Sequence, residues 1–70
     1  MKKSVKISLN GKKEIIDDNV TIFTMLSIKK LQNSKIAVEL NGEIVPRSMF
    51  HEIIIKNSDS LEIVTAVGGG

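Results

Sequence analysis

Two Asn-Gly pairs, each preceded by a segment of alternating apolar and polar residues, constrain the fold of this chain most strongly. Asn10-Gly11 follows the alternating residues 5–9, and Asn41-Gly42 follows the alternating residues 36–40. Alternation with a period of two is typical of a half-buried strand. Asn-Gly favours the two-residue turn of a β-hairpin, because both residues tolerate positive φ. The sequence therefore predicts one β-hairpin in each half of the chain.

The segment between the two hairpins carries the signals of a single helix. Thr21 is a good N-cap residue, because its hydroxyl can accept a hydrogen bond from a free amide of the first turn. Ile22, Met25 and Leu26 follow at helical spacing, so one face of the helix is expected to pack inward. The predicted helix runs from Ile22 to about Lys30.

The last third of the chain predicts one more strand. Pro46 lacks an amide hydrogen and should end the short return strand 44–45. Residues 47–52 are expected to form one helical turn. The turn 57–59 then leads into a last strand, 61–67.

These elements predict an α+β fold. Their order is strand, strand, helix, strand, strand, strand, with residues 12–16 as the second strand. If the first and last strands lie side by side, the crossover makes them parallel and central. The expected fold is a β-grasp, a mixed sheet of about four to five strands with one main helix packed on one face. We expect a β-grasp domain at residues 1–67 and a flexible C-terminal glycine tail at residues 68–70.

Composition argues against several classes of function. The chain has 70 residues with no Cys and one His, so disulfides, thiolate ligands and imidazole clusters are excluded. Ten basic and eight acidic residues are close to balance, and two Phe without Trp or Tyr give bases little to stack on, so no nucleic-acid partner is expected. No apolar run approaches the roughly 20 residues that span a bilayer. We expect a cytoplasmic protein, monomeric when free and not associated with membranes.

Few residues could carry catalysis. His51 is the only imidazole, and it is better interpreted as a surface residue on a short turn. The glutamates are spread over different elements, as on a solvated face. The chain is therefore expected not to be an enzyme by itself, and no bound cofactor or metal site is expected.

The three terminal glycines, Gly68, Gly69 and Gly70, are the remaining feature that could carry chemistry. Glycine has no Cβ, so such an end can pass through a narrow channel that other residues would block. In an arbitrary chain, a frayed end would be the better interpretation. Directly after the last strand of a predicted β-grasp, the glycines favour a functional terminus.

The chain resembles the ThiS/MoaD family of ubiquitin-like sulfur carriers over nearly its whole length. The most specific part is the run Asn-Gly-Glu-Ile-Val-Pro-Arg together with the glycine terminus. The segments that carry the resemblance are residues 7–11, 21–26, 37–47, 59–64 and 67–70.

The resemblance implies a role for the C-terminus in thiamine biosynthesis. An E1-like, ThiF-type enzyme would use ATP to adenylate the carboxylate of Gly70. Sulfur would replace AMP to give a thiocarboxylate, and a ThiG-type thiazole synthase would accept the sulfur. The resemblance also favours a docking surface beside the tail, with Val64 and Ala66 on the open sheet face, Val67 next to them and Arg47 at the flank.

Three other functions are compatible with the sequence. The small subunit of molybdopterin synthase has the same terminal chemistry, but Thr65-Ala66-Val67 before the glycines favours the thiamine branch. A ubiquitin-like protein modifier would be joined through Gly70 to lysines of other proteins. A plain interaction domain would not need its glycines.

Overall fold

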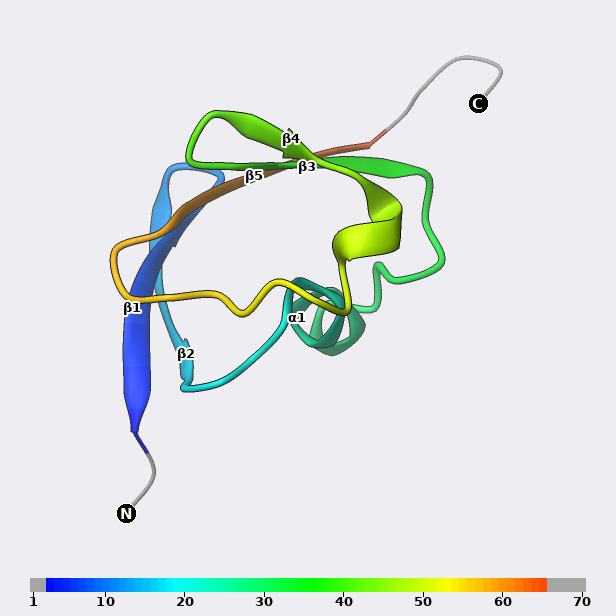
Figure 1. Cartoon of the computed structure of the whole chain (residues 1–70). Coiled ribbons are helices and arrows are strands. Elements are labelled where there is room, and N and C mark those ends of the chain that lie inside the picture. The colour runs from blue at the N-terminus through cyan, green and yellow to red at the C-terminus, as the bar shows by residue number, and fades with distance from the viewer. Residues whose placement is uncertain (1–2, 66–70) are drawn as a thin grey trace.

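A computed structural model of the chain describes residues 3–65, in which five strands form one mixed sheet in the order β2-β1-β5-β3-β4 (Figure 1). The elements are β1 (Ser4–Leu9), β2 (Lys12–Asp17), α1 (Ile22–Ile28), β3 (Ile36–Leu40), β4 (Glu43–Val45), the 3-10 turn η1 (Arg47–Met49) and β5 (Ser60–Thr65). The sheet and the single α-helix packed against one of its faces confirm the predicted α+β, β-grasp architecture.

Both predicted hairpins are present. Asn10 and Gly11 have φ values of 51° and 82°, and Asn41 and Gly42 have φ values of 53° and 88°. Two successive residues with positive φ are the signature of a type I′ turn, whose twist matches that of the flanking strands. The first hairpin pairs β1 with β2, and the second pairs β3 with β4.

Strand β5 joins the two hairpins into one sheet. It runs parallel to β1, with Leu9 opposite Leu61, and antiparallel to β3, with Leu40 also opposite Leu61. The side chains of the turn asparagines add to this pairing: Oδ1 of Asn10 accepts from the amide of Ile63 at 2.7 Å, and Oδ1 of Asn41 accepts from the amide of Ser60 at 2.9 Å. Hydrogen bonds to the turns of both hairpins therefore hold β5 in the sheet.

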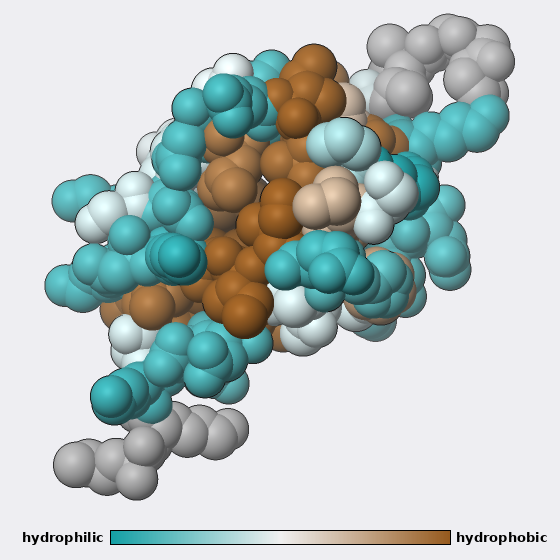
Figure 2. Space-filling model, in the orientation of Figure 1, coloured by the Kyte–Doolittle hydropathy of each residue, from teal (hydrophilic) through white to brown (hydrophobic). Residues whose placement is uncertain are grey.

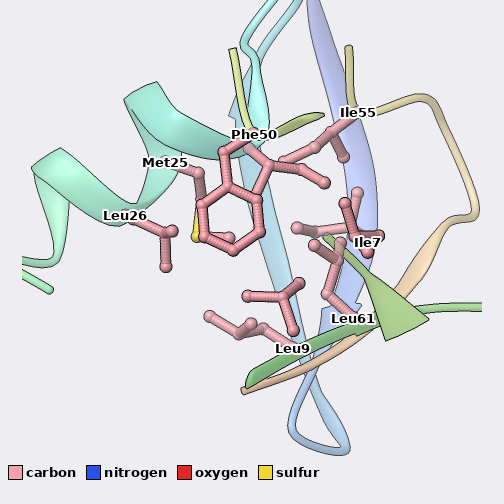
Figure 3. Close-up of a cluster of buried hydrophobic side chains, with 10 residues drawn as sticks. Ile7, Leu9, Met25, Leu26, Phe50, Ile55 and Leu61 are labelled. Atoms are coloured by element: carbon pink, nitrogen blue, oxygen red, sulfur yellow. The ribbon is translucent and has the colours of Figure 1, made fainter. Parts of the chain in front are cut away.

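The hydrophobic core lies between the sheet and α1. Figure 3 shows side chains from the helix, from β1, from β5 and from the segment between β4 and β5 pointing toward one another. In Figure 2, apolar residues continue through the middle of the molecule between hydrophilic surfaces. The buried side chains are Ile7, Leu9, Ile22, Met25, Leu26, Val38, Val45, Phe50, Ile55 and Leu61.

The helix begins as predicted but ends earlier. Thr21 is the N-cap, and its Oγ1 accepts from the amide of Thr24 at 3.1 Å. The helix ends at Ile28 because Lys30 adopts a left-handed conformation with φ of 62°. The amide of Leu31 then donates to the carbonyl of Leu26 at 2.8 Å, which closes the end of the helix.

Other element boundaries also differ from the sequence predictions. The 3-10 turn covers Arg47–Met49, whereas a helical turn over residues 47–52 was predicted. β5 begins one residue earlier than predicted, at Ser60, and is described to Thr65. Residues 66 and 67 of the predicted strand, and the predicted division of the chain at residue 68, lie outside the described residues.

Candidate functional site

The predicted reactive group is the carboxylate of Gly70, which lies outside the described residues together with Gly68 and Gly69. Within the described part, the chain approaches this group along β5, which is described to Thr65. Thr65 pairs with Ile36 of β3, whereas β1 pairs with β5 only at Ser60 and Leu61. The surface beside β5 is therefore what the structure shows of the candidate site.

The face of the sheet opposite α1 carries apolar residues beside β5. Alternation along β5 places Leu61 in the core, where it is fully buried, and Val64 on the open face, where it is 56% exposed. This position agrees with the predicted orientation of Val64. Ala66 and Val67, the other two predicted docking residues in this strand, lie outside the described residues.

Strands β3 and β4 extend this apolar area. Ala37 is exposed directly opposite Val64, and Ile44 is 71% exposed on β4. We call these three residues (Ala37, Ile44 and Val64) the open-face patch. The sequence predictions do not include Ala37 or Ile44, although the alternation within residues 36–40 indicates that Ala37 faces away from the core. Their position beside Val64 depends on the register of β3 with β5 and β4.

Two glutamates lie within the same area of the open face. Glu39 on β3 is paired directly with Glu62 on β5, and Ile44 is the residue opposite Glu39 on the other side. Glu62 is exposed and Glu39 is half-buried. Neither carboxylate forms an ion pair or a side-chain hydrogen bond with any residue between 3 and 65.

Arg47 has structural contacts. Its guanidinium donates to the carbonyl of Ser34 at 2.9 Å and to that of Gln32 at 3.4 Å, and it lies 5.5 Å from the ring centroid of Phe50. The side chain thus connects η1 to the loop between α1 and β3. Its role at the flank of a docking surface stays a prediction.

His51 stacks on the ring of Phe23, with 4.0 Å between the ring centroids. Over residues 3–65, no three His, Cys, Asp or Glu side chains are grouped as a metal site would require. The same residues contain no helix of the length and hydropathy that a membrane-spanning segment needs.

One shallow hollow lies at the opposite end of β5 from Thr65. It is lined by residues of β1, β2 and the turn before β5, namely Lys6, Ile7, Ser8, Lys13, Ser58 and Asp59. Because the hollow flanks the start of β5, it is separated by the length of the strand from the point where the chain leaves toward Gly70.

Comparison with known proteins gives one consistent result. The model of the ThiS family matches residues 3–70. The sulfur carrier protein ThiS of Bacillus subtilis is 38% identical over 91% of this chain and 98% of its own length. A thiazole synthase of Paramagnetospirillum magneticum is 35% identical over 94% of this chain, which spans only 20% of that longer protein. In structure, the chain is similar to a thiamine biosynthesis protein (ThiS) of Geobacter metallireducens, with a TM-score of 0.82, 30% identity, and coverage of 94% of this chain and 100% of the other.

Proposed function

This chain belongs to the ThiS family of sulfur carriers, and we propose that it carries sulfur for thiazole formation in thiamine biosynthesis as a thiocarboxylate on Gly70. The observation that carries the proposal is the extent of the family match, which continues from the β-grasp core through the three glycines to Gly70.

The proposed chemistry needs a partner enzyme to activate the terminus. A carboxylate is a poor electrophile because its negative charge opposes attack at carbon. An E1-like, ThiF-type enzyme would let a carboxylate oxygen of Gly70 attack the α-phosphorus of ATP, releasing pyrophosphate and forming an acyl adenylate. A sulfur nucleophile would then attack the carbonyl carbon, and AMP would leave. The groups that stabilise the developing charge would belong to the partner.

The absence of cysteine from the sequence supports the terminus as the carrying group. With no Cys, the chain cannot hold a persulfide on one of its own side chains. The terminal carboxylate can be converted into a sulfur-bearing group without any side-chain nucleophile. In this proposal the chain is a co-substrate of its partner enzymes, with no cofactor of its own, and it acts in the cytoplasm.

The relatives named thiazole synthase support that enzyme as the acceptor. In the proteins of Paramagnetospirillum magneticum and Magnetococcus marinus, a segment similar to this chain makes up 20% of a longer polypeptide of that name. Two units that occur in one polypeptide are kept at a high effective concentration, as expected for a donor and its acceptor. We propose that a ThiG-type thiazole synthase accepts sulfur from this chain.

The experiment that tests the proposal is intact-protein mass spectrometry. The purified chain is incubated with its adenylating enzyme, ATP and a sulfur source, and the product is fragmented to locate the change. We expect one carboxylate oxygen of Gly70 to be replaced by sulfur. An unchanged mass, with the enzyme shown to be active on another carrier, would contradict the proposal. Adducts with an isopeptide bond from Gly70 to a lysine would instead indicate a protein modifier.

A further inference from the structure

The pairing of Glu39 with Glu62 is not explained by the needs of the fold. The two residues lie directly opposite each other on β3 and β5, where like charges destabilise a sheet. Neither carboxylate has a cationic partner among residues 3–65. The sheet thus carries a repulsion that neutral side chains would remove.

The residues around Glu39 and Glu62 indicate that a partner protein covers the pair. Ile44 lies opposite Glu39, Val64 follows Glu62 on the same face, and Ala37 lies opposite Val64. A protein that covers the open-face patch therefore also removes water from the two carboxylates. Desolvation of two adjacent negative charges is strongly unfavourable unless the covering surface supplies a cation.

The part of the open face over β1 and β2 carries two lysines. Lys6 on β1 and Lys13 on β2 lie on this face, since they alternate with the core-facing Ile7 and with Glu14, which contacts Lys29, the C-cap residue of α1. The face is thus acidic over β3 and β5 and has a smaller net positive charge over β1 and β2, where Asp17, opposite Ser4, offsets one of the two lysines. Such a separation of charge favours one orientation of a partner over the reverse orientation. Orientation matters here because the proposed reactive group, the carboxylate of Gly70, follows β5 in the sequence.

We propose that Glu39 and Glu62 form the charged recognition element of the open-face patch, and that they bind an arginine or lysine of thiazole synthase. This inference rests on the proposed function, and it adds the chemistry by which the acceptor is recognised. Thiazole synthase is the partner chosen because a segment similar to this chain is covalently part of relatives with that name. An arginine fits best, because its planar guanidinium can donate to two carboxylates at once.

The test uses calorimetry to measure how tightly the full wild-type chain and a full-length double variant bind purified thiazole synthase. The double variant Glu39→Gln and Glu62→Gln should bind about tenfold more weakly, which corresponds to about 1.4 kcal/mol. The difference should shrink in high salt, because salt screens the attraction. The midpoint of thermal unfolding of the variant should be equal or higher, since the repulsion across β3 and β5 is removed. A merely structural role for the pair would predict a lower midpoint.

A matched control removes the same charge elsewhere. Glu43 pairs with Leu40 on the helix side of β4, and Glu52 is exposed after η1. The double variant Glu43→Gln and Glu52→Gln should bind like the wild type. Equal weakening by both double variants would show a net-charge effect and overturn the proposal, as would unchanged binding of the Glu39/Glu62 variant.

Measuring thiocarboxylate formation distinguishes a failure of this inference from a failure of the proposed function. The Glu39/Glu62 variant should still be converted at Gly70. If the variant binds thiazole synthase normally but is no longer converted, the pair serves the adenylating enzyme and the inference is wrong. If the wild type is neither converted nor bound, the proposed function itself fails.

Discussion

Residues with positive φ form several turns of this chain, and most of those in the described part are not glycine. Asn10 and Asn41 take up the left-handed conformation that Asn tolerates better than most residues, and each also accepts a hydrogen bond from an amide of β5. Ser58, with φ of 71°, and Lys30, with φ of 62°, have no such advantage. For these two residues the left-handed backbone costs about 1 kcal/mol relative to glycine.

Ser58 offers a direct test of this strain. Its amide donates to the carbonyl of Lys6 at 2.7 Å, and this bond needs no side chain at residue 58. Replacing Ser58 with Gly should raise the free energy of unfolding by about 0.5–1 kcal/mol. Chemical denaturation gives the measurement, and Ser58→Ala is the control because it keeps the Cβ. Destabilisation by Ser58→Gly would contradict the interpretation.

At the scale of elements, α1 depends on its ends. A helix of seven residues is too short to be stable alone, so packing and caps must hold it. The packing is provided by Ile22, Met25 and Leu26, and the cap by Thr21. The ion pair from Lys29 to Glu14 also connects the helix to β2, but an exposed pair contributes little.

The N-cap can be removed without changing the core. Thr21→Ala should lower the free energy of unfolding by about 1 kcal/mol, because the amide of Thr24 loses its acceptor. Thr21→Ser keeps the hydroxyl and should retain most of the stability. Thermal or chemical unfolding of the three proteins checks this, and equal loss in both variants would assign the effect to the methyl group.

The sequence predicted those elements whose signals are local. Alternation and the Asn-Gly pairs located both hairpins, and Thr21 located the start of α1. The end of the helix was missed because nothing in the sequence marks Lys30 as left-handed. The open-face patch and the pairing of Glu39 with Glu62 were missed because they depend on the register between β3 and β5, which are distant in sequence.

At the scale of the whole molecule, one small core supports the entire sheet. Leu61 is fully buried on the strand that pairs with both hairpins. Leu61→Ala should lower the free energy of unfolding by about 2–5 kcal/mol. A domain of this length is expected to have only about 4–10 kcal/mol in total, so partial unfolding at 37 °C should be visible by circular dichroism. Val64→Ala, on the exposed side of the same strand, should change stability by less than about 0.5 kcal/mol.

Stability and the proposed function should be separable at the C-terminus. Every buried hydrophobic residue found in the described part of the chain lies between Ile7 and Leu61. Deleting Gly69 and Gly70 should therefore change the free energy of unfolding by less than about 0.5 kcal/mol. The same deletion should abolish thiocarboxylate formation, measured by mass spectrometry. Retained sulfur loading in the shortened chain would place the carried sulfur elsewhere.

The central position of β5 has a consequence for how the chain is made on the ribosome. The β1–β2 and β3–β4 hairpins can each form as soon as they emerge, but they are bridged by β5, which is synthesised after both of them. A nascent chain interrupted before Ser60 would have two separate hairpins and no assembled open face. A protein that binds the open face would then bind only chains that have been translated through β5.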